Sequence, residues 1–158
     1  MTADALTLAF VGREEAAIVR DLMRAAFAEY ESVLSVPSSA MWETVEDTAA
    51  HIALGGAIVA RLGDEAVGSG RYELREDHVY IGRLSVLPAH RRHGIGEAMI
   101  LAMEERGQQA GKAEAHISVR VLLERNIALY ERLGYAVTAR YQHERGNETV
   151  VDMVKHFG

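Results

Sequence analysis

The sequence predicts one domain of the α/β (α+β) class, in which a mixed, centrally parallel sheet of about seven strands is flanked by four helices. The chain has 158 residues, 49% hydrophobic and 25% charged, which is enough to build a sizeable core. Segments with the two-residue period of strands alternate with segments of helical period. No repeat, low-complexity tract or linker divides the sequence, so we expect residues 1–158 to form a single domain.

The first elements are a strand and two helices. Alternation of apolar and polar residues predicts a strand at residues 6–11, and apolar positions at helical spacing predict a helix over residues 13–32. A polar stretch follows, and then a shorter helix at residues 45–53.

Three strands come next. Residues 57–74 have the pattern of two strands joined in an antiparallel hairpin at Gly63 and Asp64, a pair that favours turns. A further strand at residues 78–87 ends at Pro88, whose nitrogen cannot donate to a sheet.

A parallel strand pair is predicted at the centre of the sheet. An apolar stripe predicts a helix from Ile95 to near Gly111, and residues 113–119 alternate as a strand. Because a helix of this length is the usual right-handed crossover, we expect the strand ending at Leu87 and the strand from Glu114 to be parallel neighbours.

The last predicted elements are a helix and two strands. The helix covers residues 122–132 and has Gly134 as its C-terminal cap. Residues 135–141 and 149–157 should form an antiparallel pair that closes the fold.

Positive charge and bare backbone meet before the 95–111 helix, in the stretch HRRHGIG at residues 90–96. The first N–H groups of a helix are unpaired and lie at the positive end of its dipole, which suits a phosphate, and glycines let a ligand approach them. The spacing Arg-x-x-Gly-x-Gly lacks the third glycine of a dinucleotide fingerprint and the Lys of a nucleotide P-loop. The loop taken alone is equally compatible with glycines that only permit close packing.

Two segments together resemble the GNAT superfamily of N-acetyltransferases: RLSVLPAHRRHGIG at residues 83–96 and ALYERLGY at residues 128–135. Relatives have, in this order, a strand, an Arg/Gln-x-x-Gly-x-Gly/Ala loop, a helix, a strand and a Leu-Tyr-Glu-x-x-Gly-Phe/Tyr segment. The resemblance covers about residues 57–141 by motif, and the order of elements extends it over nearly the whole chain.

The resemblance implies that acetyl-CoA is the co-substrate, with its pyrophosphate on the loop and its pantetheine arm along the preceding strand. The residues it assigns to the cofactor are Leu84, Ser85, Val86, Arg91, Arg92, His93, Gly94, Ile95, Gly96 and Asn126. Asn126 departs from the family pattern, since many relatives have the asparagine where this chain has Leu123. Tyr130 matches the family tyrosine that protonates the leaving thiolate; packing of its ring in the core is the structural alternative.

The sequence does not identify a general base. Positions at which relatives often carry a glutamate read Gly82, Arg83 and Ser118. Four other candidates could lie near the acceptor: Glu31, Tyr72, Glu73 and His78. Arg83 could instead bind an acidic group of the acceptor, and Trp42 could line an acceptor pocket or pack in the core.

Composition and charge limit the classes of partner that we expect for this chain. The formal charge of −6 disfavours binding to nucleic acids and anionic membranes and favours cationic small molecules or peptides, and it is equally compatible with a charge that only keeps the protein soluble. The chain has neither a secretion signal nor an apolar run long enough to cross a membrane, so we expect it in the cytoplasm. His90 and His93 have a metal-like spacing without a convincing third ligand, and we expect no metal.

The predicted function is transfer of an acetyl group from acetyl-CoA to a primary amine of a small molecule or peptide. With no Cys in the chain and no Ser in a nucleophile motif, direct attack in a ternary complex is expected. The alternatives are a non-catalytic acyl-CoA-binding module, or a transferase that uses another acyl group or an alcohol. The acceptor is left open, as is the choice between a monomer and a homodimer.

Overall fold

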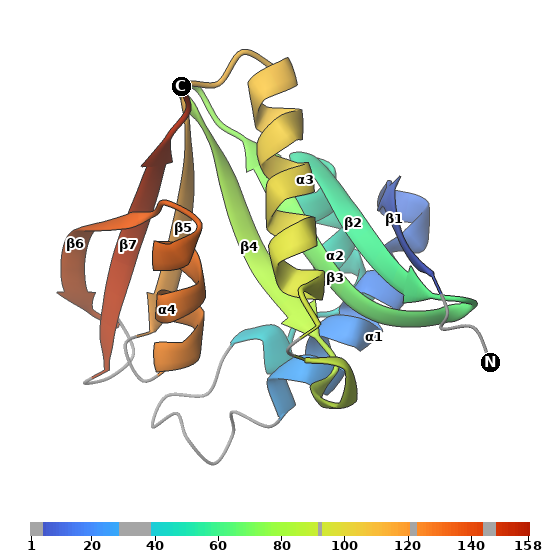
Figure 1. The fold of residues 1–158 in the computed structure, drawn as a ribbon. Helices are drawn as coiled ribbons and strands as arrows, with labels where there is room; N and C mark the ends of the chain where they lie inside the picture. The colour runs from blue at the N-terminus through green and yellow to red at the C-terminus, as the bar shows by residue number, and fades with distance from the viewer. Residues whose placement is uncertain (1–4, 29–38, 92, 121–122, 144–147) are drawn as a thin grey trace.

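A computed structural model describes residues 5–28, 39–91, 93–120, 123–143 and 148–158 (Figure 1). These residues form seven strands and four α-helices in the predicted order, which confirms the mixed α/β fold. Within these ranges, none of the helices is long and apolar enough to cross a membrane.

The described residues of the first half form four strands and two α-helices: β1 Leu6–Val11, α1 Ala16–Phe27, α2 Val45–Ile52, β2 Gly55–Leu62, β3 Glu65–Leu74 and β4 His78–Val86. Helix α1 begins three residues later than predicted, because Arg13–Glu15 form a 3-10 turn in which the Glu15 N–H donates to the Gly12 carbonyl at 3.1 Å. Its predicted end, together with Glu31, lies outside the described residues. Helix α2 begins at the predicted residue, because Thr44 and Asp47 form a reciprocal capping box.

The described residues of the second half form two α-helices and three strands: α3 Ile95–Gln109, β5 Glu114–Arg120, α4 Glu124–Arg132, β6 Ala136–Gln142 and β7 Thr149–His156. The predicted cap of α4 is confirmed. The Gly134 N–H donates to the Glu131 carbonyl and the Tyr135 N–H to the Tyr130 carbonyl, the paired bonds of a Schellman motif.

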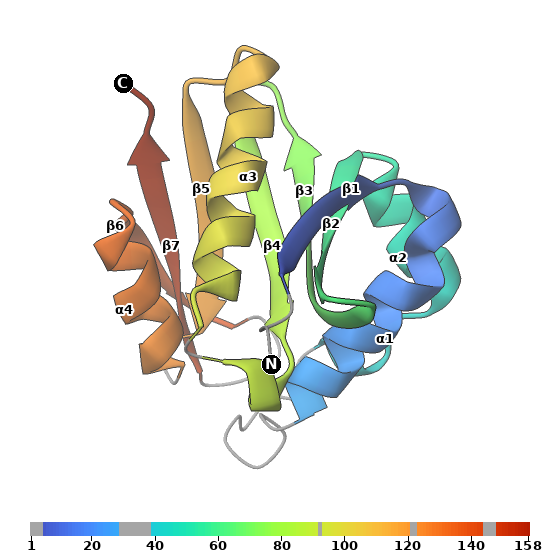
Figure 2. The same ribbon diagram turned by 45° about the vertical axis from the view of Figure 1, so that its right-hand side comes forward.

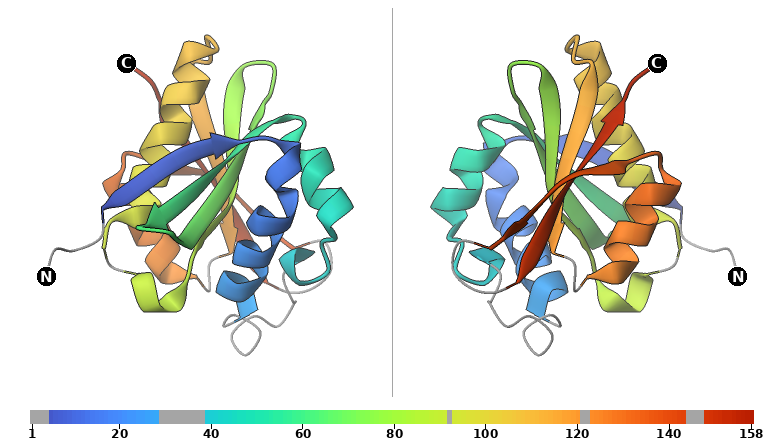
Figure 3. Two further views of the ribbon diagram at one scale, coloured as in Figure 1. Left: turned by 90° about the vertical axis from the view of Figure 1, so that its right-hand side faces the viewer. Right: turned by 90° about the vertical axis from the view of Figure 1, so that its left-hand side faces the viewer.

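The strands form one sheet in the order β1-β2-β3-β4-β5-β7-β6. β4 and β5 are parallel, as predicted, and the other neighbours are antiparallel. Helices α3 and α4 cover one face of the sheet, and α1 and α2 lie against β2, β3 and β4 on the other (Figures 1 and 2). Figure 3 (right) looks onto β6 and β7, where no described helix covers the second face.

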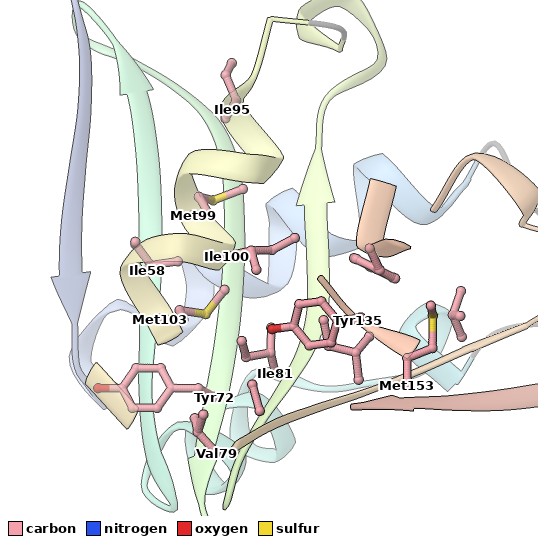
Figure 4. Packing of buried hydrophobic residues seen from close by; sticks show 14 of the residues in the cluster. Ile58, Tyr72, Val79, Ile81, Ile95, Met99, Ile100, Met103, Tyr135 and Met153 are labelled. Atoms are coloured by element: carbon pink, nitrogen blue, oxygen red, sulfur yellow. The ribbon is translucent and has the colours of Figure 1, made fainter. Parts of the chain in front are cut away.

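The main core lies between the sheet and helix α3 (Figure 4). Met99, Ile100 and Met103 of α3 are fully buried together with Val79 and Ile81 of β4. A second cluster lies under α1 and α2. Because both faces of β4 are packed, this strand is the rigid element beside which a site can be held.

One polar network crosses the main core. The Tyr135 hydroxyl donates to Glu104 Oε2 at 2.8 Å, and Lys155 Nζ donates to Glu104 Oε1 at 2.8 Å. Burial raises the pKa of Tyr135, and the negative charge of Glu104 raises it further, so the hydroxyl stays protonated. The network ties α3 to the end of α4 and to β7.

Candidate active site

The centre of the sheet is split between β4 and β5. The two strands pair at three positions, of which Tyr80↔His116 is the last. Beyond that pair, the described residues of β4 run on to Val86 and those of β5 to Arg120 without facing each other in a ladder, and Figure 1 shows the strands diverging. Backbone groups on this side of β4 therefore have no ladder partner on β5, and such a strand edge suits an extended, amide-containing ligand.

A β-bulge at Arg83 changes which face of β4 each side chain reaches. The register with β3 shifts between Ser69 and Arg71, and Arg83 has a φ of 51°. This is the one positive φ of a non-glycine residue among the described ranges, and such a conformation costs about 1–2 kcal/mol. Strain of this kind is often found at functional sites.

The bulge separates Arg83 from the core. Val79 and Ile81 point toward α3, and continued alternation would bring Arg83 to the same side. Instead Leu84 and Val86 take the α3 side, where they lie nearest to Gly96, and Arg83 reaches Glu43 on the opposite face. The Ser85 hydroxyl donates to the Arg83 carbonyl at 2.9 Å and supports the bulge.

The loop after β4 is held by Arg91. Its Nε donates to the Val86 carbonyl at 3.0 Å, and its Nη2 donates to the Ala26 carbonyl at the end of α1 at 3.2 Å. Its main-chain N–H donates to the Pro88 carbonyl at 3.4 Å. Arg91 thus fixes the loop through protein contacts. Arg92 lies outside the described residues, and His93 is exposed.

The two glycines of the loop have different structural roles. Gly94 is the N-cap of α3 with a φ of 76°, a conformation that other residues rarely adopt, and no side chain from the described residues caps the helix there. The N–H groups of Ile95, Gly96 and the next residue have no acceptor within the helix. A β-carbon on Gly96 would lie 3.5 Å from Leu84 and 3.9 Å from Leu129, which is ordinary contact. The start of α3 is therefore open to an anion.

A buried ion pair lies behind the bulge. Glu43 accepts hydrogen bonds from Arg71 at 2.5 and 3.0 Å and from the Thr48 hydroxyl at 2.6 Å, and Arg83 Nε is 3.9 Å from its carboxylate. Burial raises the pKa of Glu43, but the hydrogen bonds from Arg71 and Thr48 and the charges of Arg71 and Arg83 outweigh it and leave the pKa below its ordinary value. Glu43 is therefore ionised and fully engaged, which makes it a poor base.

A cavity of about 360 Å³ opens on this side of β4. It is lined by Trp42, Glu43, Asp47, Ala50, His51 and Arg83. Trp42 is 59% exposed, so of its two predicted roles the structure favours lining a pocket over core packing. Burial lowers the pKa of the Arg83 guanidinium, and the nearby charge of Arg71 lowers it further. The cavity is large enough for a small acceptor or a peptide end.

Helix α4 lies on the other side of the split from β4. Tyr130 is 6% exposed, and its ring meets that of Tyr135 edge to face at 6.1 Å between centroids. Asn126 lies one turn before Tyr130 and is half-buried, and its N–H donates to the Leu123 carbonyl at 3.0 Å. The Tyr130 ring thus has a core position, on a helix that lies beside the split.

The candidate bases from the sequence fall in different places. Tyr72 is buried and packs edge to face on Phe10, on the α3 side. Glu73 is engaged by His51 at 3.3 Å and Arg75 at 2.8 Å. His78 stacks on His116 at 3.6 Å between centroids, at the paired end of β4 and β5. The structure does not bring these three side chains together.

The metal-like histidine spacing has no support from geometry. His90 Nε2 lies 3.6 Å from Glu65, and His93 is exposed. In the described ranges, no group of three or more His, Asp or Glu side chains is arranged to hold a metal ion.

Sequence comparison finds a family match over the residues that form the split and the loop. Residues 17–135 match the sequence model of the acetyltransferase (GNAT) family. The chain is 24% identical over 103 residues to the uncharacterized N-acetyltransferase YjcF of Bacillus subtilis (strain 168), covering 65% of this chain and 67% of that protein.

Solved structures with coenzyme A share the fold. The PaiA N-acetyltransferase of Thermoplasma acidophilum, in complex with coenzyme A, superposes with a TM-score of 0.79 at 15% identity over 97% of this chain and 99% of that one. YncA of Salmonella typhimurium, with acetyl-CoA, gives 0.74 at 16% identity over 98% and 95%. The matched region contains the split, the bulge, the glycine loop and the α4 tyrosine, and the chain belongs to the acetyltransferase (GNAT) family.

Proposed function

We propose that this protein transfers the acetyl group of acetyl-CoA to a primary amine of a small molecule or peptide, by direct attack in one ternary complex. The observation that carries the proposal is the β4/β5 split beside the start of helix α3, which no described side chain caps, in a chain of this family. The strand edge suits an arm that contains amides, and the helix start suits a pyrophosphate, so the residues present fit coenzyme A. When bound, acetyl-CoA supplies the activated acyl group as a thioester.

The proposed cofactor contacts run along β4 to the start of helix α3. The main chain of Leu84, Ser85 and Val86 would hydrogen-bond the pantetheine arm, and the N–H groups of residues 93–96 would hold the pyrophosphate. The two relatives whose structures contain coenzyme A or acetyl-CoA support this assignment. Arg91 would act by keeping the loop in place, and Asn126 remains a candidate contact from α4. Arg92, outside the described residues, is proposed from the motif.

Tyr130 is the proposed acid for the leaving thiolate. A thiol has a pKa near 8.5 and a tyrosine hydroxyl one near 10, so a tyrosine within hydrogen-bond reach can protonate the thiolate as the C–S bond breaks. The position of Tyr130 on α4, next to the split, supports this role.

The acceptor must reach the thioester as a free amine. An alkyl amine with a pKa near 10.4 is neutral about once in 2,500 molecules at pH 7, equivalent to roughly 4.6 kcal/mol. The formal charge of −6 attracts the protonated form, and the cavity at Trp42 and Arg83 offers a place for the rest of the molecule. If Arg83 anchors the acceptor, a carboxylate on the amine would be preferred.

Thiol release from acetyl-CoA in the presence of an amine panel tests the proposal. We expect release that depends on the amine and intersecting lines when initial velocity is measured against both substrates, because both must be bound together. Binding of acetyl-CoA without turnover of any amine would indicate an acyl-CoA-binding module. Faster release with longer acyl-CoA molecules or with alcohols would indicate a different transferase.

A further inference from the structure

Several carboxylates on or beside the sheet face opposite α3 and α4 are bound by cationic or potentially cationic groups. Those held in this way are Glu43 by Arg71, Glu73 by Arg75, Asp77 by His78, Glu114 by His116, and Glu148 by Arg120. A carboxylate held by an arginine is stabilised in its ionised form and has its oxygens occupied. Such groups are poorly suited to accept a proton from a substrate.

Asp152 of β7 is bound differently. Its Oδ1 accepts hydrogen bonds from the Ser118 hydroxyl at 2.7 Å and from the Tyr141 hydroxyl at 3.1 Å. Within the described part of the chain, its Oδ2 has no hydrogen bond or ion pair, and the side chain is half-buried. Asp152 therefore combines a held orientation with an oxygen that can receive a proton.

The position of Asp152 places it beside the split. Ser118 follows the last β4–β5 pair, which is at His116, and it faces away from the buried side chains Ile117 and Val119. Asp152 is the direct register partner of Ser118 on the neighbouring strand β7. The carboxylate thus lies next to the point at which β5 leaves β4, on the face that no described helix covers.

We propose that Asp152 is the general base of the acetyl transfer, with Ser118 and Tyr141 as positioning residues. The inference depends on the proposed function. As the neutral amine forms the C–N bond to the thioester carbonyl carbon, its nitrogen becomes strongly acidic, and Asp152 takes a proton from it. The C–S bond then breaks, and the thiolate takes a proton from Tyr130. Proton exchange with solvent returns Asp152 to the carboxylate and Tyr130 to the phenol.

The two hydroxyl partners suit this task. They hold the carboxylate without bringing a full positive charge that would repel an approaching amine. Burial raises the pKa of the Tyr141 hydroxyl, and its bond to Asp152 raises it further, so Tyr141 remains a donor at neutral pH.

Asp152→Asn tests the proposal, because the amide oxygen can still accept both hydrogen bonds while the base is lost. The acceptor is an aryl amine at pH 7, which is already neutral and feels no attraction to a carboxylate. We expect kcat to fall about 10²-fold or more, with unchanged melting temperature, KM for the amine and Kd for acetyl-CoA. Glu114→Gln is the matched control, since it removes the same charge from the same face and should keep kcat.

Three results separate the possibilities. Wild-type kcat in Asp152→Asn, or a change confined to KM for alkyl ammonium acceptors, would overturn the role as a base. If that variant does not fold, Ser118→Ala provides the test: loss of one positioning bond should lower kcat about fivefold with KM unchanged, and an unchanged kcat would contradict the proposal. A wild-type protein that binds acetyl-CoA and turns over no amine would overturn the proposed function and the base together.

Discussion

Replacing Gly94 by Ala should weaken acetyl-CoA binding by about tenfold. Gly94 has a φ of 76°, and a β-carbon there would meet nothing within 4 Å, so the cost of the substitution is conformational. A left-handed alanine is less stable by about 1–2 kcal/mol. Because nothing packs around the new methyl group to hold it, we expect the loop to relax in the free protein and to recover its left-handed turn only when the cofactor binds. About 1.4 kcal/mol of strain then corresponds to a tenfold higher Kd.

Gly111→Ala is the matched control. Gly111 has a φ of 83°, and a β-carbon there would also meet nothing within 4 Å, but it caps the opposite end of α3. Its Schellman bonds, from Gly111 to Gln108 and from Lys112 to Gly107, should hold the turn in place. Its strain should therefore lower the melting temperature, by about 2–4 °C per kcal/mol, and leave Kd unchanged. Calorimetric titration of both variants with acetyl-CoA measures the difference. Equal Kd values for Gly94→Ala and the wild type would refute the link between the left-handed turn and the anion site.

Four further predictions follow from the structure. Gly96→Ala should keep cofactor binding and stability, since its β-carbon makes only ordinary contacts. Gly96→Val should abolish most of the rise in melting temperature that acetyl-CoA causes, and a rise equal to that of the wild type would contradict this prediction. Tyr130→Phe should keep Kd for acetyl-CoA and lower turnover on the order of 10²-fold; equal turnover in stopped assays would return Tyr130 to a packing role. Glu43→Gln should lower the free energy of unfolding by about 3 kcal/mol at pH 7, because it leaves buried Arg71 uncompensated. Asp21→Asn, which breaks an exposed ion pair with Arg20, should have almost no effect when both variants are compared by thermal unfolding. With a saturating alkyl amine, the rate should rise about tenfold per pH unit toward pH 8 to 9, and with an aryl amine it should hardly change. The same pH–rate profile for both amines would show that the concentration of free amine is not limiting.

The pH dependence of stability has a defined sign at Glu43. Its pKa is lowered in the folded protein, so its stabilising effect is present above the ordinary carboxyl pKa of 4.5 and is lost as pH falls through the lower folded value. The wild type should therefore lose stability over this acidic range more steeply than Glu43→Gln. Parallel curves of stability against pH for the two proteins would indicate that the pKa of Glu43 is the same in the folded and the unfolded wild type.

Local sequence signals predicted most of the fold. The Gly134 cap was predicted from short-range chemistry, and the helix between Leu87 and Glu114 is enough to require a parallel pair. The place of β7 between β5 and β6 could not be predicted, because it depends on pairing between distant segments. The same limit applies to the site, where Glu43 and Arg71 are 28 residues apart and Ser118 and Asp152 are 34 apart.

Two signals for the site were present in the sequence. The apolar phase of β4 changes from Val79 and Ile81 to Leu84 and Val86, which is the mark of a bulge at Arg83. Asp152 is the single acidic residue in the otherwise apolar run VVDMV, and an acidic side chain is unusual in a strand of this pattern. Neither signal says which partners the side chain meets, since that depends on the neighbouring strands.

Transfer of an isotope-labelled acetyl group tests the central claim most directly. The protein is incubated with labelled acetyl-CoA and a primary amine, and free thiol and labelled N-acetyl product are both quantified by mass spectrometry. We predict that thiol and acetylated amine appear in equal amounts, only when the amine is present, and that neither appears with Tyr130→Phe at more than a small fraction of the wild-type rate. Thiol release without the amine, or binding of acetyl-CoA with no labelled product from any amine, would contradict the assignment of this protein as an N-acetyltransferase acting at the β4/β5 split.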